Sequence, residues 1–154
     1  MAIYTTSAFS DPPIAHPTMG VIVNRIQHTL TAALAAGTND YLRVCKLPKG
    51  ACIVPELCAV FADADPDAGN NATVSLTITD GTTTKTIIAT ANLQAADTRL
   101  TPAAAEITGL GFFKTSNDDF AVHLNAVAND VDAAAVLYIV VAYTMVGGRS
   151  EVIV

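Results

Sequence analysis

The sequence predicts an all-β fold: an antiparallel two-sheet β-sandwich, with a jelly roll as the preferred topology. First, Val74, Leu76 and Ile78 alternate with Ser and Thr, which is typical of a strand with one buried face. Second, Asp80-Gly81 is a dipeptide that favours a tight hairpin turn. Third, turn-forming residues divide the chain into about seven or eight strand-like segments without a long helical pattern, as in a sandwich.

Residues 1–19 are predicted to form an extended N-terminal arm outside the sandwich. The segment contains three prolines, and proline disfavours both helix interiors and sheet ladders. Such an arm is either disordered or laid across a neighbouring molecule. Spaced apolar residues favour the second alternative, because a solvated tail has no need of them. These anchor residues are Ile3, Tyr4, Phe9 and Ile14.

Residues 20–146 are predicted to form the sandwich, beginning with a strand at 21–31 and a loop or strand extension at 31–36. A second strand at 41–47 ends at Pro48-Lys49-Gly50, where proline fixes the first turn position and glycine accepts a positive φ. The apolar segment 51–61 is expected to be one strand. Its Pro55 cannot donate to a ladder, so this strand is predicted to be bulged or at an edge.

The second half of the domain continues the alternation of strands and turns. A hairpin is expected to join the Val74–Thr79 strand to residues 85–88, followed by a long loop with room for one helical turn at 91–106. Residues 109–113 are expected to be a short strand or turn, and residues 120–125 a strand. The last strand, at 135–146, is apolar on both faces, so it is predicted to be central or to form a subunit contact.

Residues 147–154 are predicted to be a C-terminal tail. Two glycines at its start loosen the chain, and it ends in the apolar residues Val152, Ile153 and Val154. We expect these residues to dock on a neighbouring molecule, and disorder is the alternative.

The composition favours a protein that belongs to a larger assembly. Only 14% of residues are charged and 51% are hydrophobic, so little surface is suited to a lone monomer in water. A net charge of −6 with scattered basic residues argues against nucleic acid and against an anionic membrane surface. No signal-peptide pattern is present. The most apolar run has 14 residues, whereas a membrane helix needs about 20.

No residue pattern predicts an enzyme, a metal or a cofactor. Asp63, Asp65 and Asp67 resemble the start of a calcium loop, but Ala68 and Val74 stand where that loop needs glycine and a bidentate glutamate. The expected structure is a solvated acidic turn. The three histidines lack metal or catalytic spacing, and no nucleophile, phosphate-loop or zinc-protease motif occurs. The odd number of cysteines predicts buried thiols and not a disulfide framework.

The segment around the first predicted turn resembles a known family. Residues 42–51 read L-R-V-C-K-L-P-K-G-A and precede an apolar strand. A Thr-rich alternating strand follows, and the last strand contains a V-x-Y pattern at Val141-Ala142-Tyr143. This order resembles capsid decoration, or cement, proteins of tailed bacteriophages over residues 21–146. The resemblance implies a β-sandwich on the outside of the shell, present as a dimer or trimer and without catalytic residues.

We therefore expect a non-enzymatic virion protein that binds the outer capsid surface and bridges capsid subunits. Its expected partners are the major capsid protein and further copies of itself, a trimer being favoured over a dimer. It would be made in the cytoplasm of the bacterial host. The alternative is another virion module, such as a tail or head-fibre sandwich that binds a receptor. The residues expected to contact partners are Ile3, Tyr4, Phe9, Ile14, Val152, Ile153 and Val154.

Overall fold

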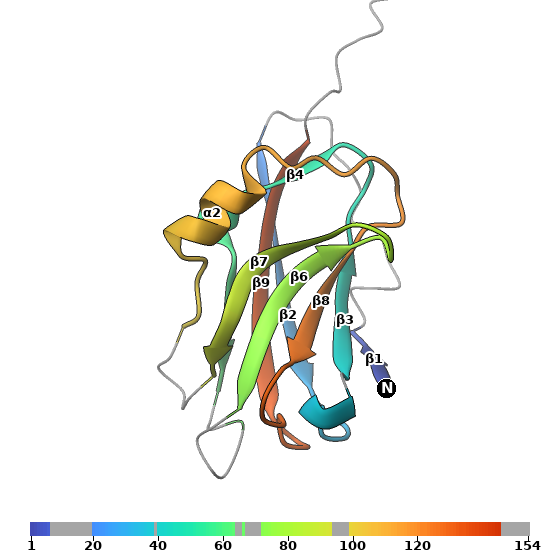
Figure 1. The fold of residues 1–154 in the computed structure, drawn as a ribbon, viewed down its shortest axis with the longest axis vertical. Coiled ribbons are helices and arrows are strands. Elements are labelled where there is room, and N and C mark those ends of the chain that lie inside the picture. The colour runs from blue at the N-terminus through green and yellow to red at the C-terminus, as the bar shows by residue number, and fades with distance from the viewer. Residues whose placement is uncertain (7–19, 39, 64–65, 67–71, 94–98, 146–154) are drawn as a thin grey trace, which may run out of the picture.

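The structure is a computed structural model that describes all residues except 7–19, 39, 64–65, 67–71, 94–98 and 146–154. Its described part contains nine strands, one α-helix and two 3-10 turns. The strands form two sheets that face each other across the core (Figure 1). The predicted all-β sandwich is confirmed.

One sheet has five strands in the order β1-β3-β8-β6-β7. All its neighbouring strands are antiparallel except β1, which runs parallel to β3. The antiparallel prediction therefore fails for this one pair at the sheet edge. The strands are β1 (Ile3–Thr5), β3 (Tyr41–Lys46), β6 (Thr73–Thr79), β7 (Thr84–Asn92) and β8 (Ala121–Ala126).

The second sheet has the order β2-β9-β4, and β5 also pairs with β9. Its strands are β2 (Val21–Thr29), β4 (Ala51–Ile53), β5 (Ala59–Ala62) and β9 (Val136–Met145). Beyond β5, a single bridge joins Val60 to Leu100. The preferred jelly roll is compatible with these strand orders, but this bridge stands where a jelly roll has a full strand. The jelly roll therefore stays a prediction.

Alternating residues place one apolar face of each sheet in the core. In β6, Val74, Leu76 and Ile78 are buried, as their spacing predicted. In β9, Leu137 and Ile139 point into the core, whereas the intervening side chains are half-exposed along most of the strand. The prediction that β9 is central is confirmed, since it pairs with β2 on one side and with β4 and β5 on the other.

The prediction of one strand over residues 51–61 is wrong. The 3-10 turn η2 (Pro55–Leu57) separates β4 from β5, and both short strands pair with β9. Pro55 begins the turn because its ring fixes φ and it has no N–H to give to a ladder. The Val54 N–H instead bonds to the Ala142 carbonyl at 2.9 Å, which keeps the turn against β9.

The helix α2 (Ala104–Leu110) also departs from the prediction of a loop followed by a strand or turn. Its first turn is stabilised by Glu106, whose side chain accepts a hydrogen bond from the Ala103 N–H at 2.7 Å. A carboxylate near a helix N-terminus also interacts favourably with the helix dipole. The helix closes one edge of the sandwich, where it contacts β7 of one sheet and η2 beside the other (Figure 1).

The two glycine turns agree with the sequence prediction. Gly50 and Gly81 have φ values of 88° and 89°, a region that glycine occupies without steric cost. In the second turn the Asp80 carboxylate accepts hydrogen bonds from the backbone N–H groups of Thr82 and Thr83, at 2.9 and 2.6 Å. The hairpin between β6 and β7 is therefore confirmed.

Candidate interaction surfaces

The described residues do not contain a group of three or more His, Cys, Asp or Glu side chains that are placed to hold a metal ion. His28 is half-buried, and burial lowers its pKa. Burial, and then the nearby charge of Arg43, lower the pKa of His123 to about 4. Both histidines are therefore neutral at pH 7. Of the suggested acidic turn, Asp65 and Asp67 lie outside the described residues.

The three cysteines are free and buried, as predicted. Burial raises the pKa of Cys45 to about 12 and that of Cys58 to about 11. A buried thiol with such a pKa is not a nucleophile at neutral pH. Among the helices that the structure describes, none has the length and apolar character needed to cross a membrane.

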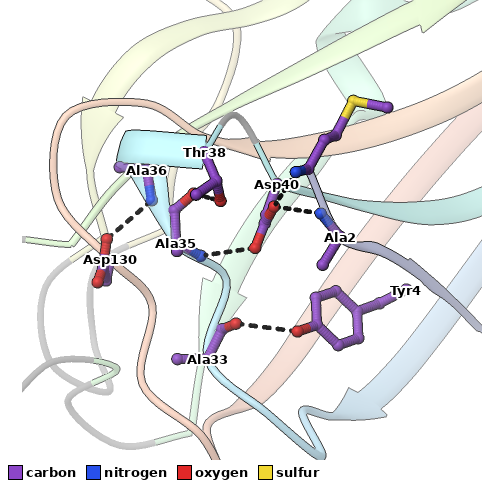
Figure 2. A network of polar contacts seen from close by, with 9 residues as sticks. Ala2, Tyr4, Ala33, Ala35, Ala36, Thr38, Asp40 and Asp130 are labelled. Atoms are coloured by element: carbon purple, nitrogen blue, oxygen red, sulfur yellow. Dashed lines mark hydrogen bonds and ion pairs between the residues drawn. The ribbon is translucent and has the colours of Figure 1, made fainter.

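The first residues of the expected arm are attached to the chain's own fold. Asp40, which is buried, accepts backbone hydrogen bonds from Ala2 and, at 3.3 Å, from Ala35 (Figure 2). The hydrogen bond from Ala2 is the main cause of the lowered pKa of Asp40. Tyr4 donates its hydroxyl to the Ala33 carbonyl at 3.2 Å, as Figure 2 shows. This network joins β1 to the loop between β2 and β3.

The structure describes two of the residues expected to contact partners, Ile3 and Tyr4, and their side chains differ in exposure. Ile3 is 42% exposed, whereas Tyr4 packs against the core. The other five expected partner-contact residues lie outside the described residues; they are Phe9, Ile14, Val152, Ile153 and Val154.

An apolar groove of about 580 Å³ crosses the outer face of the second sheet. The strand register aligns the residues that line this groove across three neighbouring strands. Tyr138 of β9 lies between Gln27 of β2 and Phe61 of β5. The rings of Phe61 and Tyr138 stack with their centroids 4.9 Å apart. The groove is therefore lined by aromatic side chains on a firmly paired sheet.

The rim of this groove is apolar and basic. Val23 and Leu57 are 43% and 44% exposed there. The charged residues among its lining side chains are Arg25 and Arg99, and no acidic residue lines it in the part of the chain that the structure describes. The two apolar faces of the last strand predicted a central strand or a subunit contact. The groove itself was not predicted, because it depends on the register that brings β2, β9 and β5 together.

Among the described residues, one large aromatic side chain is fully exposed, and it lines a hollow together with residues of η2. Phe112 is 96% exposed, although the turn that carries it is well ordered by hydrogen bonds. The Gly111 N–H bonds to the Ile107 carbonyl at 3.0 Å, and the Phe113 N–H to the Leu110 carbonyl at 2.9 Å. Phe113 turns inward and packs edge-on against Phe120 at 5.4 Å. Sequence reasoning missed this division, because two adjacent phenylalanines give no signal of which one is buried.

The outer face of the five-stranded sheet is polar. Tyr41 and His123 stack at 4.5 Å across β3 and β8. The Asn125 side-chain amide donates to the hydroxyls of Ser75 and Thr77, at 3.3 and 3.1 Å. These side chains belong to a depression of about 510 Å³ that is lined mainly by Ser, Thr, Asn, His and Tyr residues. The two outer faces of the sandwich thus offer different chemistry.

The backbone of the chain is similar to a chain in a solved structure described as "Capsid of Ralstonia phage GP4". The TM-score is 0.62, the sequence identity is 17%, and the alignment covers 96% of this chain and 100% of that chain. At this identity the likeness establishes a shared fold. No protein-family model and no curated protein sequence matches the chain.

Proposed function

We propose that the protein is a non-enzymatic structural component of a tailed-phage virion that binds the outer surface of the shell and bridges capsid subunits. The observation that carries this proposal is the full-length likeness to a chain from the GP4 capsid. Because that alignment covers nearly all of both chains, the two are similar in length. The proposed partner is the major capsid protein, and the proposed location is the outside of the virion after synthesis in the bacterial cytoplasm.

The surface of the domain supports a role in assembly. The groove on the second sheet exposes apolar side chains on a firmly paired surface, and removing apolar surface from water favours association. A protein that binds the assembled shell but not separate subunits stabilises the shell by mass action. Many equivalent copies add modest contacts through multivalency. No chemical step is required for this function.

We place the shell contacts in the two terminal segments. Ile3 offers an exposed side chain at the sheet edge, and Phe9, Ile14, Val152, Ile153 and Val154 are apolar residues of the two terminal segments. Tyr4 contributes by holding β1 in place through its hydrogen bond to Ala33. The arm and tail would each lay apolar side chains across a neighbouring subunit.

Co-sedimentation with shells assembled without the protein tests this proposal. We expect the full chain to pellet with the shells and to saturate at a fixed number of copies. A variant in which Phe9 and Ile14 are both changed to Ser should bind at least about tenfold more weakly, which corresponds to about 1.4 kcal/mol. The matched control is Val127→Ser, which changes an exposed apolar residue outside both segments. Full-chain protein that stays in the supernatant would contradict the proposal.

The polar face supports a second candidate, a receptor-binding module of a tail or head fibre. Its stacked Tyr41 and His123 rings lie beside the hydroxyl and amide groups around Asn125, and sugars bind to sites that combine rings with such groups. A glycan array probed with the full chain separates the two candidates. Glycan binding that is lost in Asn125→Ala, together with no shell binding, would favour the fibre module.

A further inference from the structure

We propose that copies of this chain associate by placing Phe112 of one copy into the apolar groove of the next. This inference deepens the proposed function, because it names the surface through which the expected homo-oligomer forms. It does not depend on shell binding, however. Two features of one molecule, both beside residues of η2, suggest this contact: the exposed side chain of Phe112 and the apolar groove.

Phe112 has the properties of an interface anchor. A phenylalanine buries about 150–250 Å² when it enters a partner, and aromatic anchors dominate interface energies. The side chain is 96% exposed on a turn fixed by hydrogen bonds from Gly111 and Phe113. Little conformational entropy is lost when a rigid turn docks. Burying this exposed ring in a partner therefore gains hydrophobic free energy and loses little conformational entropy.

The groove matches this anchor in size and character. Its volume of about 580 Å³ exceeds that of one aromatic ring, and its lining includes the stacked Phe61 and Tyr138 rings. Aromatic pairs add about 0.5–1.5 kcal/mol beyond the area that they bury. Val23 and Leu57 at the rim would cover the base of the inserted ring.

Charge complementarity selects a second copy as the occupant. The charged residues that line the groove are Arg25 and Arg99. The charged residue that lines the hollow beside Phe112 is Glu56. Docking Phe112 into the groove brings this carboxylate toward the two arginines. Placing two grooves face to face would instead oppose arginine with arginine, which is unfavourable.

The two features are neighbours on the surface of one molecule. Glu56 lines the hollow beside Phe112, and the adjacent Leu57 lines the groove. In an assembly of identical copies, each copy gives one anchor and receives one. A rotation that closes produces a dimer or a ring, whereas one that does not close produces a fibre. The favoured trimer would contain three such contacts.

Light scattering after size-exclusion chromatography tests the inference with two single variants. Phe112→Ala removes the anchor, and Val23→Arg adds a charged side chain at the groove rim. Both positions are exposed, and circular dichroism would verify that each variant is folded. We expect the wild type to form a defined oligomer and each variant to dissociate at least about tenfold more readily. Val127→Arg is the matched control, because Val127 is 41% exposed and lies outside both features.

A mixture of the two variants provides the decisive result. The Val23→Arg copy keeps its anchor and the Phe112→Ala copy keeps its groove, so the mixture should form a 1:1 dimer that neither variant forms alone. Several results would overturn the inference: a monomeric wild type, a Phe112→Ala variant that oligomerises normally, a mixture that stays monomeric, or an equal effect of Val127→Arg. Shell co-sedimentation of the same variants keeps the two proposals apart. Shell binding by a wild-type monomer would sink only the inference, and a normal oligomer that ignores shells would sink only the capsid function.

Discussion

Changing Tyr143 to Phe should make the protein more stable. Tyr143 is fully buried, and its hydroxyl has no hydrogen-bond partner among the described residues. An unsatisfied buried polar group costs about 1–3 kcal/mol. Removing the oxygen leaves a very small cavity, which costs a few tenths of a kcal/mol at about 24 cal/mol per Å³. We therefore expect the free energy of unfolding to rise by roughly 0.5–2 kcal/mol.

Urea denaturation and thermal unfolding measure this effect. For a domain of this size, 1 kcal/mol shifts Tm by about 2–4 °C, so Tyr143→Phe should raise Tm by a few degrees. Tyr138→Phe is the matched control, because Tyr138 lies on the half-exposed face of the same strand and its hydroxyl can reach water. A loss of stability of more than about 1 kcal/mol in Tyr143→Phe would refute the reasoning, because it would mean that the hydroxyl is satisfied.

The same substitution should change the response to high pH. Burial, and then the proximity of Cys45, raise the pKa of Tyr143 to about 12 from its usual value of 10. A raised pKa in the folded state contributes stability that is present below pH 10 and is lost as the pH rises toward 12. The wild type should therefore lose more stability than Tyr143→Phe between pH 10 and 12. Equal losses in the two proteins would contradict this assignment.

Three further predictions concern the turns and the N-terminal strand. Thr115→Val should lower the free energy of unfolding, measured by urea denaturation, by about 1–3 kcal/mol. The Thr115 hydroxyl accepts a hydrogen bond from the Ala51 N–H at 2.9 Å and donates one to the Pro48 carbonyl at 2.7 Å. An unchanged midpoint of urea unfolding would count against this prediction. Gly81→Ala should cost about 1–2 kcal/mol and lower Tm, since Gly81 has a φ of 89°; a higher Tm would show that the turn relaxes. The hydrogen bond from the Ala2 backbone lowers the pKa of Asp40 from its usual value of 3.8, so the contribution of this carboxylate to the stability of the fold should be lost as the pH falls below 3.8. Asp40→Asn should abolish that part of the acid dependence of Tm. An unchanged profile of Tm against pH would refute the role of the carboxylate.

The strands were predictable wherever one face is buried. The alternation of Val74, Leu76 and Ile78 follows from the two-residue repeat of a strand, and all three are buried. The hairpin at Asp80-Gly81 was equally clear, because its turn needs a residue with positive φ. In these segments local chemistry and tertiary packing favour the same conformation.

The elements that depart from the prediction depend on tertiary contacts, which a local sequence pattern does not show. Pro55 signalled an interruption, but whether it produces a bulge, an edge or the turn η2 depends on β9, which bonds the residues on both sides. The helix α2 has seven residues, too few for a periodic signal, and a helix this short depends on tertiary contacts, which β7 and η2 provide. The parallel pairing of β1 is a long-range contact with no local pattern.

The candidate surfaces were the least predictable part. The groove exists because register sets Tyr138 between Gln27 and Phe61, residues that are far apart in the sequence. The exposure of Phe112 depends on a turn that directs its neighbour Phe113 toward Phe120. The expected anchors were chosen for apolar character alone, and of the two that are described, Tyr4 serves the chain's own fold.

The most direct test of the proposed capsid function is the stability of shells with and without the protein. Filled particles that lack the protein would be heated in steps, and released DNA would be followed with a dye that cannot enter intact shells. A ligand at 100 times its Kd stabilises its target by about 2.7 kcal/mol per site. Adding the protein back should therefore raise the release temperature until all sites are filled. A release temperature that does not change at saturating protein would contradict the proposed function.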